Sequence, residues 1–107
     1  MSVLLVHCTC PDTESAERIA DALVDERLAA CVSRLPGVQS TYRWEDRVRR
    51  GSEVLLLIKT CNDRFDALSA RVLELHPYEL PELVAVEAHA GLAPWLQWVA
   101  QQTRLDD

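Results

Sequence analysis

The first third of the chain consists of a short apolar run followed by one long amphipathic segment. Residues 3–6 are apolar and partly β-branched, which predicts a buried strand that stops before Pro11 and Asp12. Either Asp12 or Thr13 can cap a following helix through its side-chain oxygen. Apolar residues then recur at steps of three and four and form one helical stripe at Ala16, Ile19, Ala20, Leu23, Val24 and Leu28.

The middle of the chain predicts a strand and then a long hairpin. Residues 29–35 form an apolar run that the turn dipeptide Pro36-Gly37 should end. Over residues 38–48 apolar and charged side chains alternate, as in a strand with one solvated face. A turn over residues 49–52 leads into residues 53–60, whose apolar side chains occupy both faces. Arms of about ten residues would reach about 33 Å.

The last third predicts a helix, a stiff loop, a strand and a short helix. Phe65, Leu68, Val72 and Leu75 form the buried stripe of the helix, and Thr60 or Asn62 can cap it. The helix should end at His76, because Pro77 disfavours helical geometry at the residue before it. Residues 76–82 form a polar loop with two prolines, residues 83–86 a strand, and residues 93–102 a helix with Pro94 in its first turn.

The order β-α-β-β-α-β with a trailing helix predicts an α+β fold of the ferredoxin-like, split βαβ type, as one domain over residues 1–107. Three of the strands are apolar on both faces, a pattern typical of strands that are covered on each side. One chain supplies too little helix to cover both faces, and monomers seldom expose large apolar patches. A homo-oligomer is therefore expected.

Composition narrows the class of partner. The net charge is −6, from 11 basic and 17 acidic side chains, which disfavours nucleic acid. The local cluster of Arg43, Arg47, Arg49 and Arg50 is read as a solvated hairpin edge in preference to a phosphate groove. No signal sequence and no apolar stretch of membrane-spanning length is seen, so the cytoplasm is expected, and with it reduced cysteines.

The thiols and the proline-bounded loop offer two candidate sites. Cys8 and Cys10 are either small buried side chains or a metal-binding pair, and chelation would require the chain to bend at Pro11. Cys31 is either a core residue or a ligand. In the loop, His76, Tyr78, Glu79 and Glu82 can bind a metal or act as acid and base, whereas Glu82 can instead pair with Lys59.

Motifs of catalysis are missing from the sequence. It has no glycine-rich phosphate loop, no His-x-x-x-His or Cys-x-x-Cys pair and no serine nucleophile motif. We therefore predict that the chain is not an enzyme. A cleft that holds Cys31, His76 and Glu82 within hydrogen-bond reach would contradict this prediction.

In order and spacing, motifs over nearly the whole chain resemble the CutA, or divalent-cation tolerance, family. They are Cys8-Thr9-Cys10-Pro11-Asp12, Leu28-Ala29-Ala30-Cys31-Val32, Pro36-Gly37-Val38 with Ser40, Tyr42 and Trp44, Ile58-Lys59-Thr60, His76-Pro77-Tyr78-Glu79, Pro81-Glu82-Leu83 and Trp95. The resemblance implies a subunit of a tight homotrimer with a fold like that of the PII signalling proteins. It also implies an association with copper and other divalent ions.

By position, Cys8 and His76 match residues of the family that are proposed copper contacts, and Cys31 and Glu82 match further polar positions nearby. Two departures stand out. Leu75 replaces a second histidine that some members carry, which removes a soft-metal ligand. Asp46 replaces the glycine usual at the hairpin turn, and it tolerates a positive φ less well, so a shifted bulge is possible there.

Two functions compete at this point. The first is metal binding for ion tolerance, with Cys8, Cys31, His76 and Glu82 as ligands, a set that favours copper or zinc. The second is a trimeric regulatory or scaffold module that holds a small ligand or partner in a cleft between subunits, at Trp44, Lys59 and Tyr78, although shared fold is weak evidence of shared function. Trp44 is also expected to anchor the interface between subunits.

Overall fold

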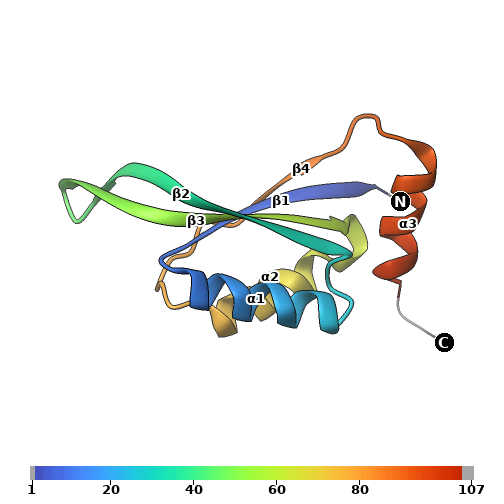
Figure 1. Cartoon of the computed structure of the whole chain (residues 1–107), viewed down its shortest axis with the longest axis horizontal. Helices are drawn as coiled ribbons and strands as arrows, with labels where there is room; N and C mark the ends of the chain where they lie inside the picture. Colours follow the sequence, from blue (N-terminus) through green and yellow to red (C-terminus); the bar gives the residue numbers. More distant parts are fainter. Residues whose placement is uncertain (1, 105–107) are drawn as a thin grey trace.

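The computed structural model describes residues 2–104, which form one antiparallel sheet with two helices on one face and a third helix at one end (Figure 1). The strand order is β2-β3-β1-β4. The elements are β1 (Val3–Cys10), α1 (Thr13–Asp25), β2 (Cys31–Trp44), β3 (Arg47–Cys61), the 3-10 turn η1 (Asn62–Arg64), α2 (Phe65–Leu75), β4 (Val84–Glu87) and α3 (Ala93–Gln102). The predicted ferredoxin-like order, with its long hairpin and trailing helix, is confirmed.

Strand β1 is longer than predicted. It continues through Cys8, Thr9 and Cys10, which pair with Leu56, Leu55 and Val54 of β3. Threonine suits a pleated strand, and cysteine behaves as a small apolar residue there. The strand ends at Cys10 and is followed by Pro11 and Asp12, as expected. Both cysteines therefore lie in regular strand, and the bend at Pro11 comes after them.

Helix α1 forms where the apolar stripe predicts it. The carboxylate of Asp12 accepts a hydrogen bond of 2.8 Å from the backbone N–H of Ser15, which confirms Asp12 as the N-cap. Ala16, Ile19 and Leu23 are buried against the sheet. Leu28 lies beyond the last residue of the helix and packs into the same core.

The hairpin differs from the prediction at two places. Pro36-Gly37 does not end β2 but forms a bulge, with one extra residue between Leu35 and Val38 and a φ of 77° at Gly37. The turn lies at Glu45-Asp46, with φ values of 53° and 62°, and not at residues 49–52, which belong to β3. A two-residue turn with both φ values positive matches the twist of long paired strands, and this pairing outweighs the local preference for glycine.

The departure at Asp46 leaves the register of the turn unchanged. Trp44 pairs directly with Arg47 across the turn, so the shifted bulge that the missing glycine suggested does not occur there. Gly51, which had pointed to a turn, lies inside the ladder opposite Ser40. Aspartate is among the residues that most readily take the left-handed conformation, which explains why the turn survives without glycine.

The second helix ends as predicted but begins differently. Helix α2 stops at Leu75, and His76 is extended with φ −77° and ψ 135°, as Pro77 requires. Neither proposed residue caps it. The side chain of Asn62 accepts a hydrogen bond from the N–H of Ser2 at 3.0 Å, and the hydroxyl of Thr60 donates to the carbonyl of Leu28 at 2.7 Å. The turn η1 leads into the helix instead.

The last strand and helix lie close to their predicted positions. Strand β4 runs from Val84 to Glu87, one residue later than predicted, and pairs with β1 at the edge of the sheet. Helix α3 spans Ala93–Gln102 with Pro94 in its first turn, as expected. It packs against Val3 and Cys61 through a small second core that contains Val99. None of the helices in residues 2–104 is long and apolar enough to span a membrane.

The two faces of the sheet have different environments. We call the face under α1 and α2 the covered face, and its central side chains, such as Val6, Leu56 and Ile58, are fully buried. We call the opposite face the open face. Its apolar side chains are half-buried or exposed, with Val84 at 51% and Val86 at 50%. Helix α3 covers one end of the open face (Figure 1).

Candidate metal site on the covered face

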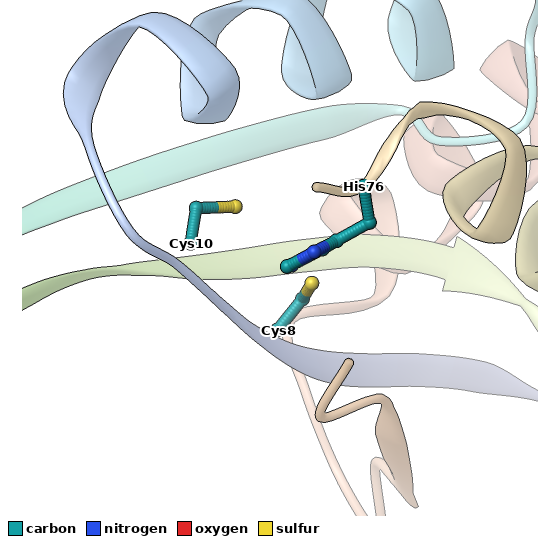
Figure 2. A group of neighbouring side chains, drawn as sticks. All are labelled: Cys8, Cys10 and His76. Carbon is teal, nitrogen blue, oxygen red and sulfur yellow. The ribbon is translucent and has the colours of Figure 1, made fainter. Parts of the chain in front are cut away.

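Three potential ligand side chains meet between the sheet and the helices. Cys8 and Cys10 point from β1 toward the helices, and His76 points back toward β1 from the residue after α2 (Figure 2). Their ligand atoms all lie within 4.8 Å of one another, and all three side chains are buried. We call this group the thiol–imidazole cluster.

The strand periodicity and the helix end bring these residues together. Cys8 and Cys10 are two positions apart in β1, so they share a face, and it is the covered one. His76 follows α2 directly and takes an extended conformation because of Pro77. This backbone places its ring over β1, where Nε2 lies 2.7 Å from the carbonyl oxygen of Thr9.

Both nitrogens of the His76 ring have hydrogen-bond partners. The backbone N–H of Tyr78 donates to Nδ1 at 3.0 Å, so Nδ1 carries no proton. The proton of the neutral ring is then on Nε2, which donates to the carbonyl of Thr9. His76 thereby links β1 to the loop after α2, and in this conformation neither nitrogen has a free lone pair.

The two thiols interact with each other. Cys8 donates a hydrogen bond to Cys10, and together with burial and the nearby charges of Glu82 and Glu53 this raises the pKa of Cys8. Accepting that bond lowers the pKa of Cys10. The pair therefore keeps a proton on Cys8 in the structure as it stands.

The donor set fits a thiophilic metal ion in part. Thiolates are soft ligands, and imidazole binds copper and zinc. Two thiolates on one ion can be about 4.6 Å apart at most, from a metal–sulfur bond of about 2.3 Å. The two sulfur atoms lie within 4.8 Å of each other in regular strand. The bend expected from sequence is not needed. The imidazole fits less well, because both of its nitrogens are already hydrogen-bonded.

Tyr78 and Glu53 border the cluster. The hydroxyl of Tyr78 donates to the carboxylate of Glu53 at 2.7 Å, and its ring lies 4.9 Å from that of His76. Burial and the bond to Glu53 raise the pKa of Tyr78. Glu82 is exposed, and its charge acts on Cys8, but it is not among the three residues whose ligand atoms converge.

The other candidate residues lie elsewhere. Cys31 pairs with Lys59 on the open face, where the ammonium of Lys59 donates to the hydroxyl of Ser33 at 2.6 Å and not to Glu82. Trp44 is at the far end of the hairpin, opposite Arg47. Arg47 and Lys59 are twelve positions apart in β3, a separation of about 40 Å along the strand. A cleft that contains Trp44, Lys59 and Tyr78 therefore cannot be formed by one chain.

The four arginines of the hairpin do not form one patch. Arg43 and Arg50 lie on one face of the ribbon, whereas Arg47 and Arg49 lie on the other, because they occupy alternate positions of paired strands. Arg49 pairs with Glu45 at 3.0 Å. This distribution agrees with the interpretation of the cluster as a solvated hairpin edge.

Sequence reasoning left the role of Cys10 open. The signal that could have assigned it was the spacing of two from Cys8, which predicts a shared face in any strand. Glu53 was likewise overlooked, because its contact with Tyr78 joins residues that are distant in sequence. No pattern within either segment indicates that contact.

Comparison with known proteins gives consistent results. Residues 4–102 match the family model of the CutA1 divalent ion tolerance protein. A divalent-cation tolerance protein CutA of Thermus thermophilus is 46% identical over 92% of this chain and 96% of its own length. The human Protein CutA is 43% identical over 95% of this chain, which spans 57% of that relative. The crystal structure of CutA from Xylella fastidiosa, 46% identical, superposes with a TM-score of 0.94 and covers 97% of this chain and all of its own.

Proposed function

The chain belongs to the CutA1 divalent ion tolerance family, and we propose that it contributes to ion tolerance by binding copper or a related metal ion at the thiol–imidazole cluster. The family is described by tolerance to ions and not by a catalysed reaction, so the chain is not classed as an enzyme, in agreement with the prediction from sequence. The metal and its ligands are the part that we propose here.

The convergence of Cys8, Cys10 and His76 carries the proposal. Two elements distant in sequence supply three nitrogen or sulfur donors within 4.8 Å, in a buried position. Thiolate and imidazole are ligands for copper and zinc, whereas magnesium and calcium favour oxygen ligands. Cys31 and Glu82, which the resemblance also suggested, can join such a site only through a rearrangement or a neighbouring subunit.

A titration with single-residue variants tests the metal proposal. Calorimetry with copper and with zinc should detect binding to the wild-type protein, and Cys8→Ser should remove most of it. Cys61→Ser is the matched control, because this thiol is equally buried but packs in the second core beside α3. Equal binding by the wild-type protein and Cys8→Ser would exclude this cluster as the metal site.

We also propose that the protein is a homotrimer, as the family resemblance implies. Two features support self-association. The open face carries half-exposed apolar residues such as Val84 and Val86, and β2 is a 14-residue edge strand whose outer side pairs with no other strand of residues 2–104. Sedimentation at micromolar concentration should give three times the mass of the chain, and a folded monomer under these conditions would refute the proposal.

The cytoplasm remains our proposed compartment, because a metal site that contains two thiolates requires reduced cysteines.

The alternative function is a regulatory module with a ligand cleft between subunits. It requires Trp44, Lys59 and Tyr78 of different copies to come together, since one chain holds them far apart. Nucleotides and metal ions titrated in parallel into the purified oligomer would separate the two functions: binding of a nucleotide without a metal would favour the module.

A further inference from the structure

The hydrogen bonds of His76 limit how the cluster can bind a metal. For the ring to become a ligand, it must give up either the carbonyl of Thr9 at 2.7 Å or the N–H of Tyr78 at 3.0 Å. Leaving a buried polar group without its hydrogen-bond partner is unfavourable. The thiols of Cys8 and Cys10 are hydrogen-bonded to each other, and neither has another hydrogen-bond partner among residues 2–104 that metal binding would displace. They are the donors that are ready to bind.

The oxygen atoms that could complete a larger set of metal ligands are either hydrogen-bonded to another residue or outside the cluster. The carboxylate of Glu53 accepts the hydroxyl of Tyr78 at 2.7 Å, and Glu82 is exposed and outside the converging group. Protein zinc sites generally use four ligands. This cluster offers two, and both are soft. An ion that is satisfied by two thiolates therefore fits better than one that needs four mixed ligands.

We infer that the cluster binds a soft monovalent ion, with Cu(I) as the biological example, through the thiolates of Cys8 and Cys10, and that His76 is a positioning residue and not a ligand. This inference rests on the proposed function and specifies its ligands. On binding, the two S–H bonds break, the protons pass to solvent, and two metal–sulfur bonds form. The oxidation states of metal and sulfur do not change.

The spacing of the sulfur atoms agrees with a two-coordinate ion. Ligands on opposite sides of an ion are about 4.6 Å apart, whereas tetrahedral ligands are about 3.8 Å apart for the same bond length. The sulfur atoms lie within 4.8 Å of each other on a regular strand, so two ligands on opposite sides of one ion are compatible with this limit. The ion would also take the place of the proton that now lies between the sulfurs, and the negative charges of Glu53 and Glu82 favour a cation there.

The Cu(I) affinity is measured under anaerobic conditions, in competition with a chromophoric Cu(I) chelator. Ag(I) serves as a second monovalent probe, because it does not change oxidation state. The wild-type protein should bind one Cu(I) or Ag(I) per chain. Cys8→Ser and Cys10→Ser should each weaken binding on the order of 100-fold or more, since even supporting residues of metal sites contribute 10- to 100-fold. Cys61→Ser, whose thiol packs in the second core beside α3, is the control and should bind like the wild-type protein.

Two variants of His76 separate a positioning residue from a ligand. His76→Gln retains an amide that can donate to Thr9, so its Cu(I) affinity should stay within about 3-fold of the wild-type value. His76→Ala loses the link between β1 and the loop and should weaken binding about 10-fold. X-ray absorption of the Cu(I) protein should detect sulfur neighbours without imidazole, and circular dichroism should show that each variant is folded.

Each outcome separates this inference from the proposed function. If the wild-type protein binds none of Cu(I), Ag(I) and Zn(II), the proposed metal site itself is wrong. If metal binds and depends on Cys8 and His76 but not on Cys10, the metal function stands and the two-thiolate inference is overturned. Binding of Zn(II) as tight as that of Cu(I), or imidazole in the X-ray absorption spectrum, would likewise overturn it.

Discussion

The two faces of the sheet are built from the same strands but meet different surroundings. On the covered face, side chains such as Leu56 are fully buried by α1 and α2 and surround the thiol–imidazole cluster. On the open face, Leu57 is only half-buried, and its neighbours include Lys59 and Cys31. Apolar content alone does not distinguish the faces. The difference shows that one face is covered within the chain, whereas the other is left partly uncovered by residues 2–104, as the proposed homotrimer requires.

This contrast also sorts the four cysteines. Cys8 and Cys10 lie on the covered face beside His76, Cys31 lies on the open face, and Cys61 packs beside α3. Two thiols of one strand can share an ion only if their side chains point to the same face of the sheet. The four cysteines are chemically alike, so a shared function can be assigned only once the face of each strand position is known.

The largest effect is expected from a truncation on the covered face. Leu56→Ala removes a side chain with no exposed surface from the core between the sheet and the helices. The free energy of unfolding should fall by about 2–5 kcal/mol, because transfer and cavity terms add. Urea unfolding monitored by circular dichroism measures this loss, and a change below 1 kcal/mol would mean that the core is not packed as described.

The same truncation one residue later tests the open face. Leu57→Ala is the matched partner of Leu56→Ala in the same strand, but its side chain points away from the helices. We expect its effect to depend on protein concentration, since in the proposed trimer the lost contact lies between copies and dissociation by mass action is linked to unfolding. The two variants should therefore diverge on dilution. Parallel behaviour at all concentrations would argue against an interface on the open face.

Trp44 extends this comparison to the end of the hairpin. It lies on the open-face side opposite Arg47 and is 38% exposed in the single chain. Buried aromatic residues often dominate the energy of an interface, so Trp44→Ala should weaken the trimer by about 2 kcal/mol or more. Sedimentation across a dilution series gives this value. An unchanged trimer would place Trp44 at the surface or in a ligand cleft instead.

The sequence predicted the helices better than the hairpin, for physical reasons. The stripe of α1, its cap at Asp12 and the end of α2 before Pro77 depend on local spacing and sterics, which the sequence contains. The turn at Glu45-Asp46 and the bulge at Pro36-Gly37 depend on how two long strands pair. Local glycine and proline signals therefore pointed to the wrong residues.

The candidate site was predictable in part. Its location near Cys8 and His76 followed from the family resemblance, and their convergence is visible in the structure. Whether Cys10 belongs to the site depends on which face of β1 the helices cover. When a strand is apolar on both faces, its sequence does not indicate the covered face. The Nε2 atom of His76 is hydrogen-bonded to a residue 67 positions away along the chain, and Nδ1 to a residue 2 positions away. Neither bond is indicated by a local sequence pattern.

The loss of one buried hydrogen bond on the covered face should lower the free energy of unfolding by less than the loss of the Leu56 side chain does. The hydroxyl of Thr60 donates to the carbonyl of Leu28 at 2.7 Å in a fully buried position. Thr60→Val keeps the shape but leaves this carbonyl without its partner, which should cost about 1–3 kcal/mol. Ser33→Ala on the open face, which removes the exposed bond to Lys59, is the comparison and should change stability little. Equal losses in both variants would contradict the difference between the faces.

The smallest effect is expected at the start of α1, the helix that closes the covered face. The hydrogen bond from Ser15 holds the pKa of Asp12 below its ordinary value of about 3.9. Since the folded pKa is the lower one, this stabilisation is present above the unfolded pKa and is lost as the pH falls through the folded pKa. Asp12→Ala should therefore lower the thermal midpoint at pH 7, and its difference from the wild-type protein should narrow near pH 2. Asp12→Asn, which retains a capping oxygen at every pH, should not show that narrowing relative to Asp12→Ala. A difference between wild type and Asp12→Ala that is the same at both pH values would mean that the carboxylate does not stabilise the helix through its charge.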